Sequence, residues 1–284
     1  MYEAFYGLAE PAFAITPDPR FLFLTRGHRD ALAYLHYGIE QRKGFLALTG
    51  EVGTGKTLLI RTLLGQLPDD IETAIVMNAR LNFKQLLYLA LLDFNVQPAG
   101  KSKVELLLAL QQYLLKLRDK SGNAVLIIDE AQNLSEESLE EFRLLSNFET
   151  ANAKLIQIVL VGQPELRSLL NRHSLRQLRQ RIPGVHDLSR LPAESVREYV
   201  DFRLQVASKG KTTGLLTDRA IEELARVSGG IPRIVNQICD RALLVGYVKS
   251  AERIDLEQVR EAARELDWVT EALPPSSSSL FRSS

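Results

Sequence analysis

The fold of this chain is decided by one octapeptide, Gly50-Glu51-Val52-Gly53-Thr54-Gly55-Lys56-Thr57. The apolar run 45–48 precedes it, and residues 58–64 follow with helical character. A glycine-rich turn between a strand and a helix, closed by a Lys-Thr pair, is the pattern of a phosphate-binding loop. The alternative is a turn of the same shape that binds nothing, which the Lys-Thr pair and the flanking elements disfavour.

Each part of this loop has a predicted role. The glycines leave backbone N–H groups free to surround a phosphate, and the helix that begins here adds the positive end of its dipole. We expect Lys56 to reach the β- and γ-phosphates of a nucleotide and the Thr57 hydroxyl to ligate Mg²⁺. Residues 50–57 and Leu58 are therefore the predicted nucleotide-binding segment.

The composition is that of a globular protein without net charge. Of the 284 residues, 45% are apolar, and the 35 basic and 35 acidic side chains cancel. No global field draws the chain to nucleic acid or membrane, although a local patch can still bind DNA. The single cysteine, Cys239, cannot form an internal disulfide and is expected in the core, which fits a reducing compartment. The histidines show no metal-ligand spacing, and packing or surface roles are expected for His28 and His36.

Nothing in the sequence predicts export or membrane insertion. Residues 1–5 lack the basic region and apolar core of a secretory signal. No apolar stretch reaches about 18 residues, because the richest ones, 85–92 and 104–117, are interrupted by Gln, Glu or Lys. We expect a soluble, cytoplasmic chain with no transmembrane segment.

Strands and helices alternate up to residue 191. Continuous apolar runs predict strands at 45–49, 73–77, 124–128, 155–161 and 184–190. Apolar residues at helical spacing predict helices at 28–42, 56–66, 82–93, 103–119 and 135–148, with shorter ones between 164 and 181. This order predicts an α/β fold in which helices cover both faces of a parallel sheet.

After residue 191 the strand signals stop. Helices are predicted at 193–208, 217–228, 231–249 and 255–266. The predicted domains are therefore a nucleotide-binding core, 1–191, in which residues 1–43 form an extension and the first helix, and a small helical lid, 192–270. The Ser- and Pro-rich tail, 271–284, is predicted to be disordered.

An acidic pair is predicted to complete the nucleotide site. The apolar strand 125–128 ends in Asp129 and Glu130, at the sheet edge where open parallel sheets bind ligands. We expect Asp129 to hold Mg²⁺ and Glu130 to orient or deprotonate the attacking water. Charged residues commonly end strands, but after a phosphate-binding loop the functional interpretation is preferred.

Polar residues after the next strand are further candidates. Gln163 follows the strand 155–161 and can sense the γ-phosphate or position water, or it can belong to a plain strand-ending turn. Arg181, with Arg179 second, is the candidate to reach the γ-phosphate of a neighbouring subunit. A solvated basic helix face is the alternative for both arginines.

Two segments outside the sheet have candidate roles at the nucleotide. Arg233 follows Gly229-Gly230-Ile231-Pro232, a helix start, where it can contact the nucleotide and couple its state to the lid. It can also merely pair with a carboxylate. The apolar segment 21–23 can supply an adenine pocket together with the lid, or it can be packing.

These motifs, in this order, resemble those of the AAA+ ATPases. More narrowly, the chain is similar to the ExeA (general secretion pathway protein A) and MshM (MSHA pilus biogenesis) group over about residues 2–266. The segments that carry the narrower resemblance are Phe5-Tyr6-Gly7-Leu8, Pro11, Phe13, Thr16-Pro17-Asp18-Pro19-Arg20-Phe21-Leu22, the loop 50–57, Ile128-Asp129-Glu130-Ala131-Gln132, Val161-Gly162-Gln163-Pro164-Glu165-Leu166 and Leu178-Arg179-Gln180-Arg181-Ile182.

The resemblance implies a P-loop NTPase of the AAA+ type, with an αβα core and a small all-helical C-terminal lid. It implies an ATPase that uses ATP and Mg²⁺, forms a ring or an ATP-induced homo-oligomer, and assists assembly of secretion or pilus machinery at the bacterial inner membrane. The expected partners are further copies of the chain and a protein of that machinery. Gln163 departs from the small polar residue usual in AAA+ sensors.

Secretion-type members of the group continue past the lid into a membrane helix and a periplasmic peptidoglycan-binding domain. This sequence stops in a serine-rich tail. We therefore expect either a soluble member of the group or the cytoplasmic part of a longer protein. The resemblance does not imply peptidoglycan binding for this chain.

Other functions were weighed against this one. A DNA-associated ATPase of the TniB-like transposition-regulator type shares the motif pattern, and the arginine-rich segment 167–190 is a possible phosphate-contacting face. A nucleotide-gated scaffold with little turnover is disfavoured by the intact Glu130. A Ras-like GTPase is disfavoured because no Asn-Lys-x-Asp segment is present.

Overall fold

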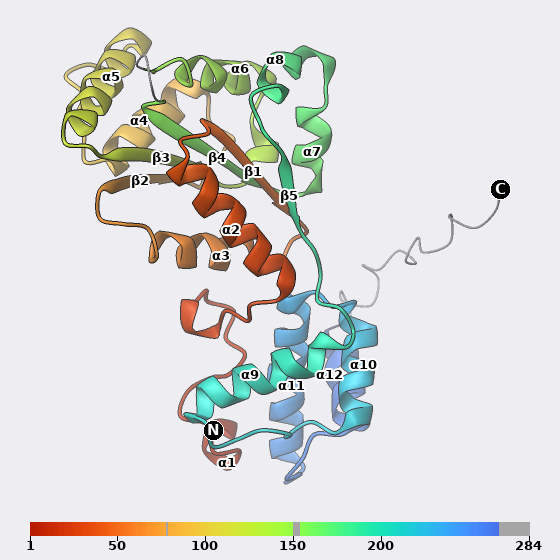
Figure 1. Ribbon diagram of the computed structural model, residues 1–284. Coiled ribbons are helices and arrows are strands. Elements are labelled where there is room, and N and C mark those ends of the chain that lie inside the picture. The colour runs from red at the N-terminus through yellow and green to blue at the C-terminus, as the bar shows by residue number, and fades with distance from the viewer. Residues whose placement is uncertain (78, 150–153, 267–284) are drawn as a thin grey trace, which may run out of the picture. The chain divides into compact units, whose positions relative to one another are not determined.

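The computed structural model describes residues 1–77, 79–149 and 154–266. The chain divides into two compact units (Figure 1). The sheet unit is Leu24–Ser189, and the described part of the helical unit is built from Met1–Phe23 and residues 190–266. The tail predicted at 271–284 lies outside the described residues. Within those residues, the structure contains no helix that is long and apolar enough to cross a membrane.

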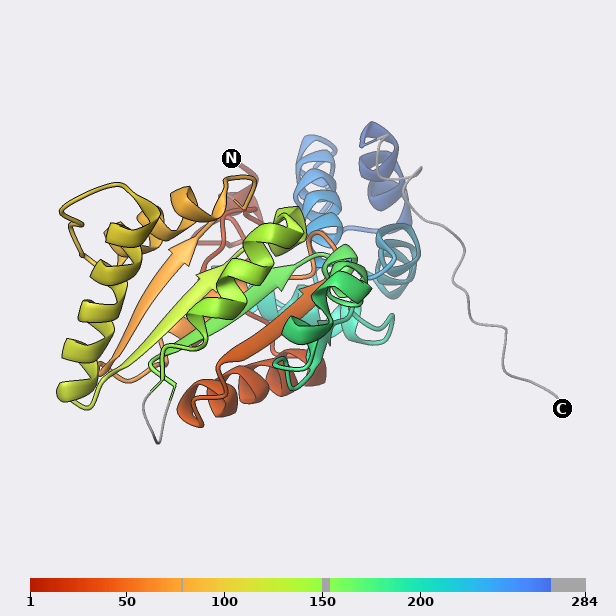
Figure 2. The same ribbon diagram turned by 90° about the horizontal axis from the view of Figure 1, so that it is seen from above.

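The sheet unit is organised around five parallel strands, which lie side by side in Figure 2. The strands are β1 Phe45–Gly50, β2 Ile71–Val76, β3 Asn123–Ile128, β4 Ile156–Gly162 and β5 Val185–Leu188. Their order is β2-β3-β4-β1-β5. In register, Leu48 of β1 pairs with Val161 of β4, and Ile128 of β3 pairs with Leu160. The prediction of a parallel sheet is confirmed.

Helices cover both faces of this sheet (Figure 1). One face is packed by α2 Arg26–Glu40 and α3 Lys56–Leu64. The opposite face is packed by α4 Phe83–Asp93, α5 Lys103–Asp119, α6 Glu136–Leu145, α7 Pro164–Leu170 and α8 Arg176–Arg179. Successive residues of a strand point to opposite faces, so Val125 and Ile127 join the first core whereas Leu126 and Ile128 join the second. Both apolar faces of the central strands are therefore buried.

The helical unit contains α9 Ser195–Ser208, α10 Asp218–Ser228, α11 Pro232–Val248 and α12 Leu256–Glu265. The Thr217 side chain caps α10 by accepting from the Ala220 amide, and Asp255 forms a capping box with Gln258 at α12. The Thr217 hydroxyl also donates to Asp255 Oδ1 at 2.6 Å, so the two helix starts are tied together. The all-helical C-terminal region is as predicted.

The first 23 residues pack on the helical unit, and we call this segment the strap. It contains α1 Tyr2–Phe5 and the 3-10 turn η1 Pro19–Phe21. Its main chain bonds to α9, where the Ala9 amide donates to the Ala207 carbonyl at 2.8 Å. The Tyr6 hydroxyl donates to the Ala251 carbonyl at 3.0 Å, and a Cβ on Gly246 would lie 2.5 Å from that hydroxyl. A glycine at 246 therefore leaves room for the ring.

This packing differs from the predicted domain boundaries, which placed residues 1–43 with the core. The division falls after Phe23 instead of at 191 alone, because the apolar side chains of the strap join the core of the helical unit. The strap side chains in that core are Tyr2, Tyr6, Leu8, Ala12, Phe13 and Phe21. A sequence pattern shows that such residues need burial but does not show which surface buries them.

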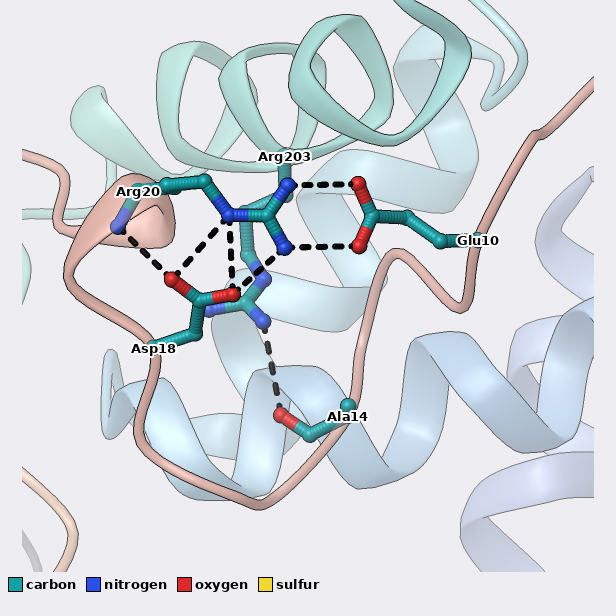
Figure 3. A network of polar contacts seen from close by, with 5 residues as sticks. All are labelled: Glu10, Ala14, Asp18, Arg20 and Arg203. Atoms are coloured by element: carbon teal, nitrogen blue, oxygen red, sulfur yellow. Dashed lines mark hydrogen bonds and ion pairs between the residues drawn. The ribbon is translucent and has the colours of Figure 1, made fainter.

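One arginine joins the strap to α9, and a second one bonds within the strap (Figure 3). Arg203 of α9 is only 5% exposed, and its Nε donates to the Ala12 carbonyl at 2.7 Å. Its guanidinium lies 4.8 Å from the centre of the Phe21 ring. Arg20, in contrast, forms exposed ion pairs with Glu10 and Asp18. Because Phe21 packs under Arg203 in this core, the structure favours the packing interpretation of that ring over a role in an adenine pocket.

Candidate nucleotide-binding site

The order of the strands brings the predicted site residues to one edge of the sheet. Gly50 ends β1, Ile128 ends β3 and Gly162 ends β4, and β4 lies between the other two. Parallel strands present their carboxyl ends at the same edge, which is where ligands bind in open α/β sheets. The residue after β4, Gln163, is therefore placed between the phosphate loop and the Asp129–Glu130 turn.

The conformation of the phosphate loop depends on its glycines. Gly53 and Gly55 have φ values of 84° and 100°, a region that side chains rarely adopt. A Cβ on Gly50 would lie 2.8 Å from the Leu188 carbonyl oxygen of β5. Thr54 is fully buried, and its hydroxyl donates to the Glu51 carbonyl at 2.9 Å. The glycines thus permit the turn, and Thr54 fixes it from inside.

Lys56 lies folded into this loop. It is 8% exposed, and its Nζ donates to the carbonyls of Gly50 at 2.7 Å and Glu51 at 2.9 Å. Lys56 is also the first residue of α3, so its charge coincides with the N-terminus of that helix. A buried ammonium and the positive end of a helix dipole at one point attract an anion. This is the electrostatic property that a phosphate site requires.

Asp129 and Thr57 approach each other across the edge of the sheet. The Thr57 hydroxyl donates to Asp129 Oδ2 at 3.5 Å, and the Glu130 amide donates to Oδ1 at 2.8 Å. Burial raises the pKa of the Asp129 carboxyl, and the negative charge of Glu130 raises it further. The hydrogen bond from the Glu130 amide and the positive charge of Lys56 lower the pKa. A cation beside this carboxylate would offset the unfavourable burial of its charge.

The oxygens of Asp129 and Thr57 therefore fit a divalent cation. Among the described residues, no three His, Cys, Asp or Glu side chains converge on one point. A metal held here would depend on one carboxylate, one hydroxyl and oxygens from water or phosphate. Mg²⁺ is the ion that prefers such a set, because it keeps several waters and binds few protein ligands.

Glu130 is held by two side-chain amides. Its Oε2 accepts from Gln132 Nε2 at 2.5 Å and from Gln163 Nε2 at 3.2 Å. Its backbone is left-handed, with a φ of 53°, although it is not a glycine. Strained backbone of this kind concentrates at functional sites. The predicted catalytic carboxylate and the predicted sensor are thus in direct contact.

Gln132 is a site residue to which the sequence analysis assigned no role. It lies in the 3-10 turn η2 Ala131–Asn133, and its Oε1 accepts from the Gln163 amide at 3.0 Å. A Cβ on Gly162 would lie 2.7 Å from that oxygen, so the glycine admits it. Gln132 therefore joins the end of β4 to Glu130. The signals in the sequence are its position two residues after Glu130 and its place in the segment 128–132 that carries the family resemblance.

The two candidate arginine fingers bond within the chain. Arg181 Nη1 donates to three oxygens at the end of α6, namely the Arg143 carbonyl at 3.3 Å, Ser146 Oγ at 2.5 Å and Asn147 Oδ1 at 2.8 Å. Arg179 donates to the Ile182 carbonyl at 3.1 Å. A cation that bonds the last carbonyls of a helix also complements its dipole. The role of Arg181 or Arg179 toward a neighbouring subunit stays a prediction.

Arg233 lies in the helical unit, at the predicted helix start. It is exposed and follows Pro232, the first residue of α11. The preceding Gly230 has a φ of 75°, and a Cβ there would lie 2.1 Å from the Leu191 carbonyl oxygen. The Leu191 amide donates to the Gly230 carbonyl at 2.8 Å. Glycine is therefore required at 230 to start α11, while the role of Arg233 at the nucleotide stays a prediction.

Comparison with known proteins identifies relatives of the sequence. Residues 39–170 match the AAA domain family. Over 270 residues, which are 95% of this chain, the sequence is 42% identical to general secretion pathway protein A of Aeromonas hydrophila. The chain spans 49% of the length of that relative.

Solved structures with this fold include Cdc6p from Pyrobaculum aerophilum and Drosophila ORC bound to DNA. The Cdc6p structure matches with a TM-score of 0.71 at 22% identity, and the match covers 93% of this chain and 74% of the Cdc6p chain. The Drosophila ORC structure matches with a TM-score of 0.72 at 18% identity, and the match covers 94% of this chain and 66% of the ORC chain. The RuvB Holliday junction branch migration motor of Thermotoga maritima matches with a TM-score of 0.54 at 20% identity, and the match covers 89% of this chain and 72% of the RuvB chain. At these identities the likeness shows the fold alone, and that fold is the predicted AAA+ type.

Proposed function

Because the chain is an AAA domain protein with extensive sequence identity to general secretion pathway protein A, we propose that it is a Mg²⁺-dependent ATPase. We propose further that it acts as a homo-oligomer and assists assembly of bacterial secretion or pilus machinery. The observation that carries the proposal is the convergence of Lys56, Thr57 and Asp129 with Glu130 at one sheet edge.

In this proposal each residue acts on a different part of Mg·ATP. The loop amides and Lys56 bind the β- and γ-phosphates, and Thr57 and Asp129 supply oxygens to Mg²⁺. The metal, when bound, neutralises charge on the transferred phosphoryl group. Glu130 orients the attacking water and accepts its proton, while Gln132 and Gln163 fix the direction of the carboxylate.

Two substitutions separate binding from hydrolysis. We expect Lys56→Ala to weaken ATP binding, because it removes the charge buried in the loop. We expect Glu130→Gln to bind Mg·ATP with nearly unchanged affinity and to lose hydrolysis by at least about a hundredfold, because an amide cannot accept the proton. Calorimetry and phosphate release measure the two effects. A Glu130→Gln protein that hydrolyses ATP at the wild-type rate contradicts the assignment of the catalytic carboxylate.

The cellular part of the proposal rests on the name of the relative, and the chain spans only half of that relative. Its test is a strain that lacks the gene and is complemented with the wild-type or the Glu130→Gln chain. The cellular role is supported if the wild-type chain restores secretion or piliation and the Glu130→Gln chain does not. Full restoration by Glu130→Gln would separate the cellular role from hydrolysis.

The DNA-associated alternative gains no support from the arginine-rich segment 167–190. Most of its arginines have partners within the chain. Arg167 donates to the Val185 carbonyl, Arg172 pairs with Glu136, and Arg179 and Arg181 bond to main-chain carbonyls. Salt-dependent binding of the chain to duplex DNA in the presence of ATP would restore this alternative.

A further inference from the structure

The imidazole of His28 lies buried against the phosphate loop. His28 is the third residue of α2, and it is 4% exposed. Its ring forms a hydrogen bond with the main chain of Thr54, and its Nε2 lies 3.3 Å from the position of a Cβ on Gly55. The chemistry proposed above does not use this side chain.

The partners of His28 determine which ring nitrogen carries the proton. Nδ1 lies 2.6 Å from the Thr25 hydroxyl oxygen, and that oxygen accepts from the His28 amide at 3.2 Å as the cap of α2. The hydroxyl hydrogen of Thr25 is thereby directed to Nδ1, which accepts it. We therefore assign the hydrogen to Nε2, the nitrogen on the Gly55 side, which makes the Thr54 carbonyl its acceptor. Burial lowers the pKa of His28, which agrees with a neutral ring.

This bond fixes the orientation of one peptide group in the loop. A trans peptide is planar, so its C=O and N–H point in opposite directions. A Thr54 carbonyl that faces His28 therefore directs the Gly55 N–H away from α2. Gly55 has a φ of 100°, and a glycine on the C-terminal side of this peptide lets its φ change at little steric cost. The Thr54 hydroxyl holds the Glu51 side of the turn, and the bond from His28 holds the peptide that follows Thr54.

We propose that His28 is a positioning residue that holds the Thr54–Gly55 peptide with its N–H available to a nucleotide phosphate. The proposal rests on the nucleotide-binding function proposed above. A donor group already oriented before binding avoids the loss of conformational freedom when the phosphate arrives. The predicted effect is on nucleotide affinity and not on the chemical step.

The test compares substitutions that keep or remove the donor at position 28. His28→Leu fills a similar volume without a donor, whereas His28→Gln can place an amide N–H close to the position of Nε2. We expect His28→Leu to raise the Kd for Mg·ADP and Mg·ATP about tenfold, and His28→Gln to stay within about threefold of the wild type. The rate at saturating ATP should change little in either variant.

His36→Leu is the matched control, because His36 lies on the same helix and its ring contacts the Gln66 side chain instead of the loop. A second pair covers the case in which His28→Leu does not fold. Thr25→Val removes the donor to Nδ1 and should weaken nucleotide binding several-fold, and Thr25→Ser should not.

The outcomes separate this inference from the proposed function. A folded His28→Leu protein with wild-type affinity refutes the role of His28 while nucleotide binding stands. The same holds if Thr25→Val and Thr25→Ser bind nucleotide equally well. If the wild-type protein binds no nucleotide at all, the proposed function itself fails.

Discussion

Glu130 occupies a backbone conformation that few side chains adopt, and two amides hold its carboxylate. Gln132 comes from the turn after β3 and Gln163 from the turn after β4, so Glu130 is fixed by two adjacent strands. A movement at the end of β4 would therefore displace the carboxylate directly. This gives a physical route from the γ-phosphate sensor predicted at Gln163 to the carboxylate that we propose orients the water.

The contacts of Arg181 predict two separable effects of its loss. Arg181→Ala should lower the free energy of unfolding by about 1–2 kcal/mol, because oxygens at the end of α6 lose their donor. If Arg181 also reaches a neighbouring subunit, ATP turnover of the assembled oligomer should fall about a hundredfold or more while the Kd for ATP stays unchanged. Chemical denaturation and turnover at saturating ATP measure the two.

Ser146→Ala is the control for the local effect, since it removes one partner of Arg181 and keeps the guanidinium. Its turnover should remain at the wild-type level. A loss of turnover in Ser146→Ala as large as that in Arg181→Ala would show that a disturbed α6, and not a missing finger, causes the defect.

Candidate site residues that belong to local motifs could be predicted from the sequence, whereas two residues that contact them from a distance could not. Lys56 and Thr57 belong to one octapeptide, and Asp129 ends an apolar strand, so each is visible in a short window. Gln132 and His28 contact Gln163 and Thr54, which lie far away in the sequence. A lone glutamine or histidine carries no signal of such a pairing.

At the scale of elements, the predicted helices and strands are confirmed and their ends are shifted. The helix predicted at 135–148 stops at Leu145, where the Ser146 hydroxyl donates to the Arg143 carbonyl at 2.7 Å. The strand predicted at 184–190 covers only Val185–Leu188, because it pairs with β1 alone and only along residues 47–50. Hydrogen bonds at helix ends and the length of the neighbouring strand set these ends, and apolar periodicity carries no information about either.

Glu223 joins two helices of the helical unit and predicts a dependence of stability on pH. Its carboxylate accepts from Arg226 Nε at 2.8 Å within α10 and from Arg260 Nε of α12 at 3.0 Å. The hydrogen bond from Arg226 is the main cause that lowers the pKa of Glu223 to about 2. The ionised carboxylate therefore stabilises the fold fully above its unfolded pKa of about 4.3, and this contribution is lost as pH falls toward 2.

Glu223→Gln should accordingly reduce the free energy of unfolding by about 1 kcal/mol at pH 7, because both arginines are largely exposed. Its difference from the wild type should shrink between about pH 5 and pH 2. Denaturation curves across this range are the measurement, with the exposed neighbour Glu222→Gln as control. A difference that does not change with pH would contradict the assigned ion pairs.

At the scale of the whole molecule, the helical unit is discontinuous in sequence. The strap and residues 190–266 form one core, and the sheet unit is inserted between them in the sequence. The apolar periodicity after residue 191 predicts the helices of this unit, but the order of the motifs places the strap with the other domain. The aromatic residues of the strap signal burial, yet no local pattern identifies a partner more than 180 positions away, as Arg203 is from Ala12.

The two arginines of Figure 3 make a matched test of how the strap is held. Arg203→Met should destabilise the helical unit by about 3 kcal/mol, because it removes a buried donor and leaves the Ala12 carbonyl without it. Arg20→Met removes exposed ion pairs and should lower stability by less than about 1 kcal/mol. Limited proteolysis of residues 1–23 and thermal unfolding report both effects. Equal losses in the two variants would rule out the buried guanidinium as the main anchor.

The bond between the Tyr2 hydroxyl and Asp240, like that between Tyr6 and Ala251, has a consequence for biosynthesis. A ribosome makes the strap long before it makes the helices that receive it. During this interval, about ten seconds or longer at common elongation rates, the tyrosines and Phe13 have no native surface to cover them. The contiguous segment Leu24–Ser189 can meanwhile complete its sheet, so the order of synthesis favours a finished sheet unit beside an unanchored strap. In that state we expect early chaperone contact at residues 1–23.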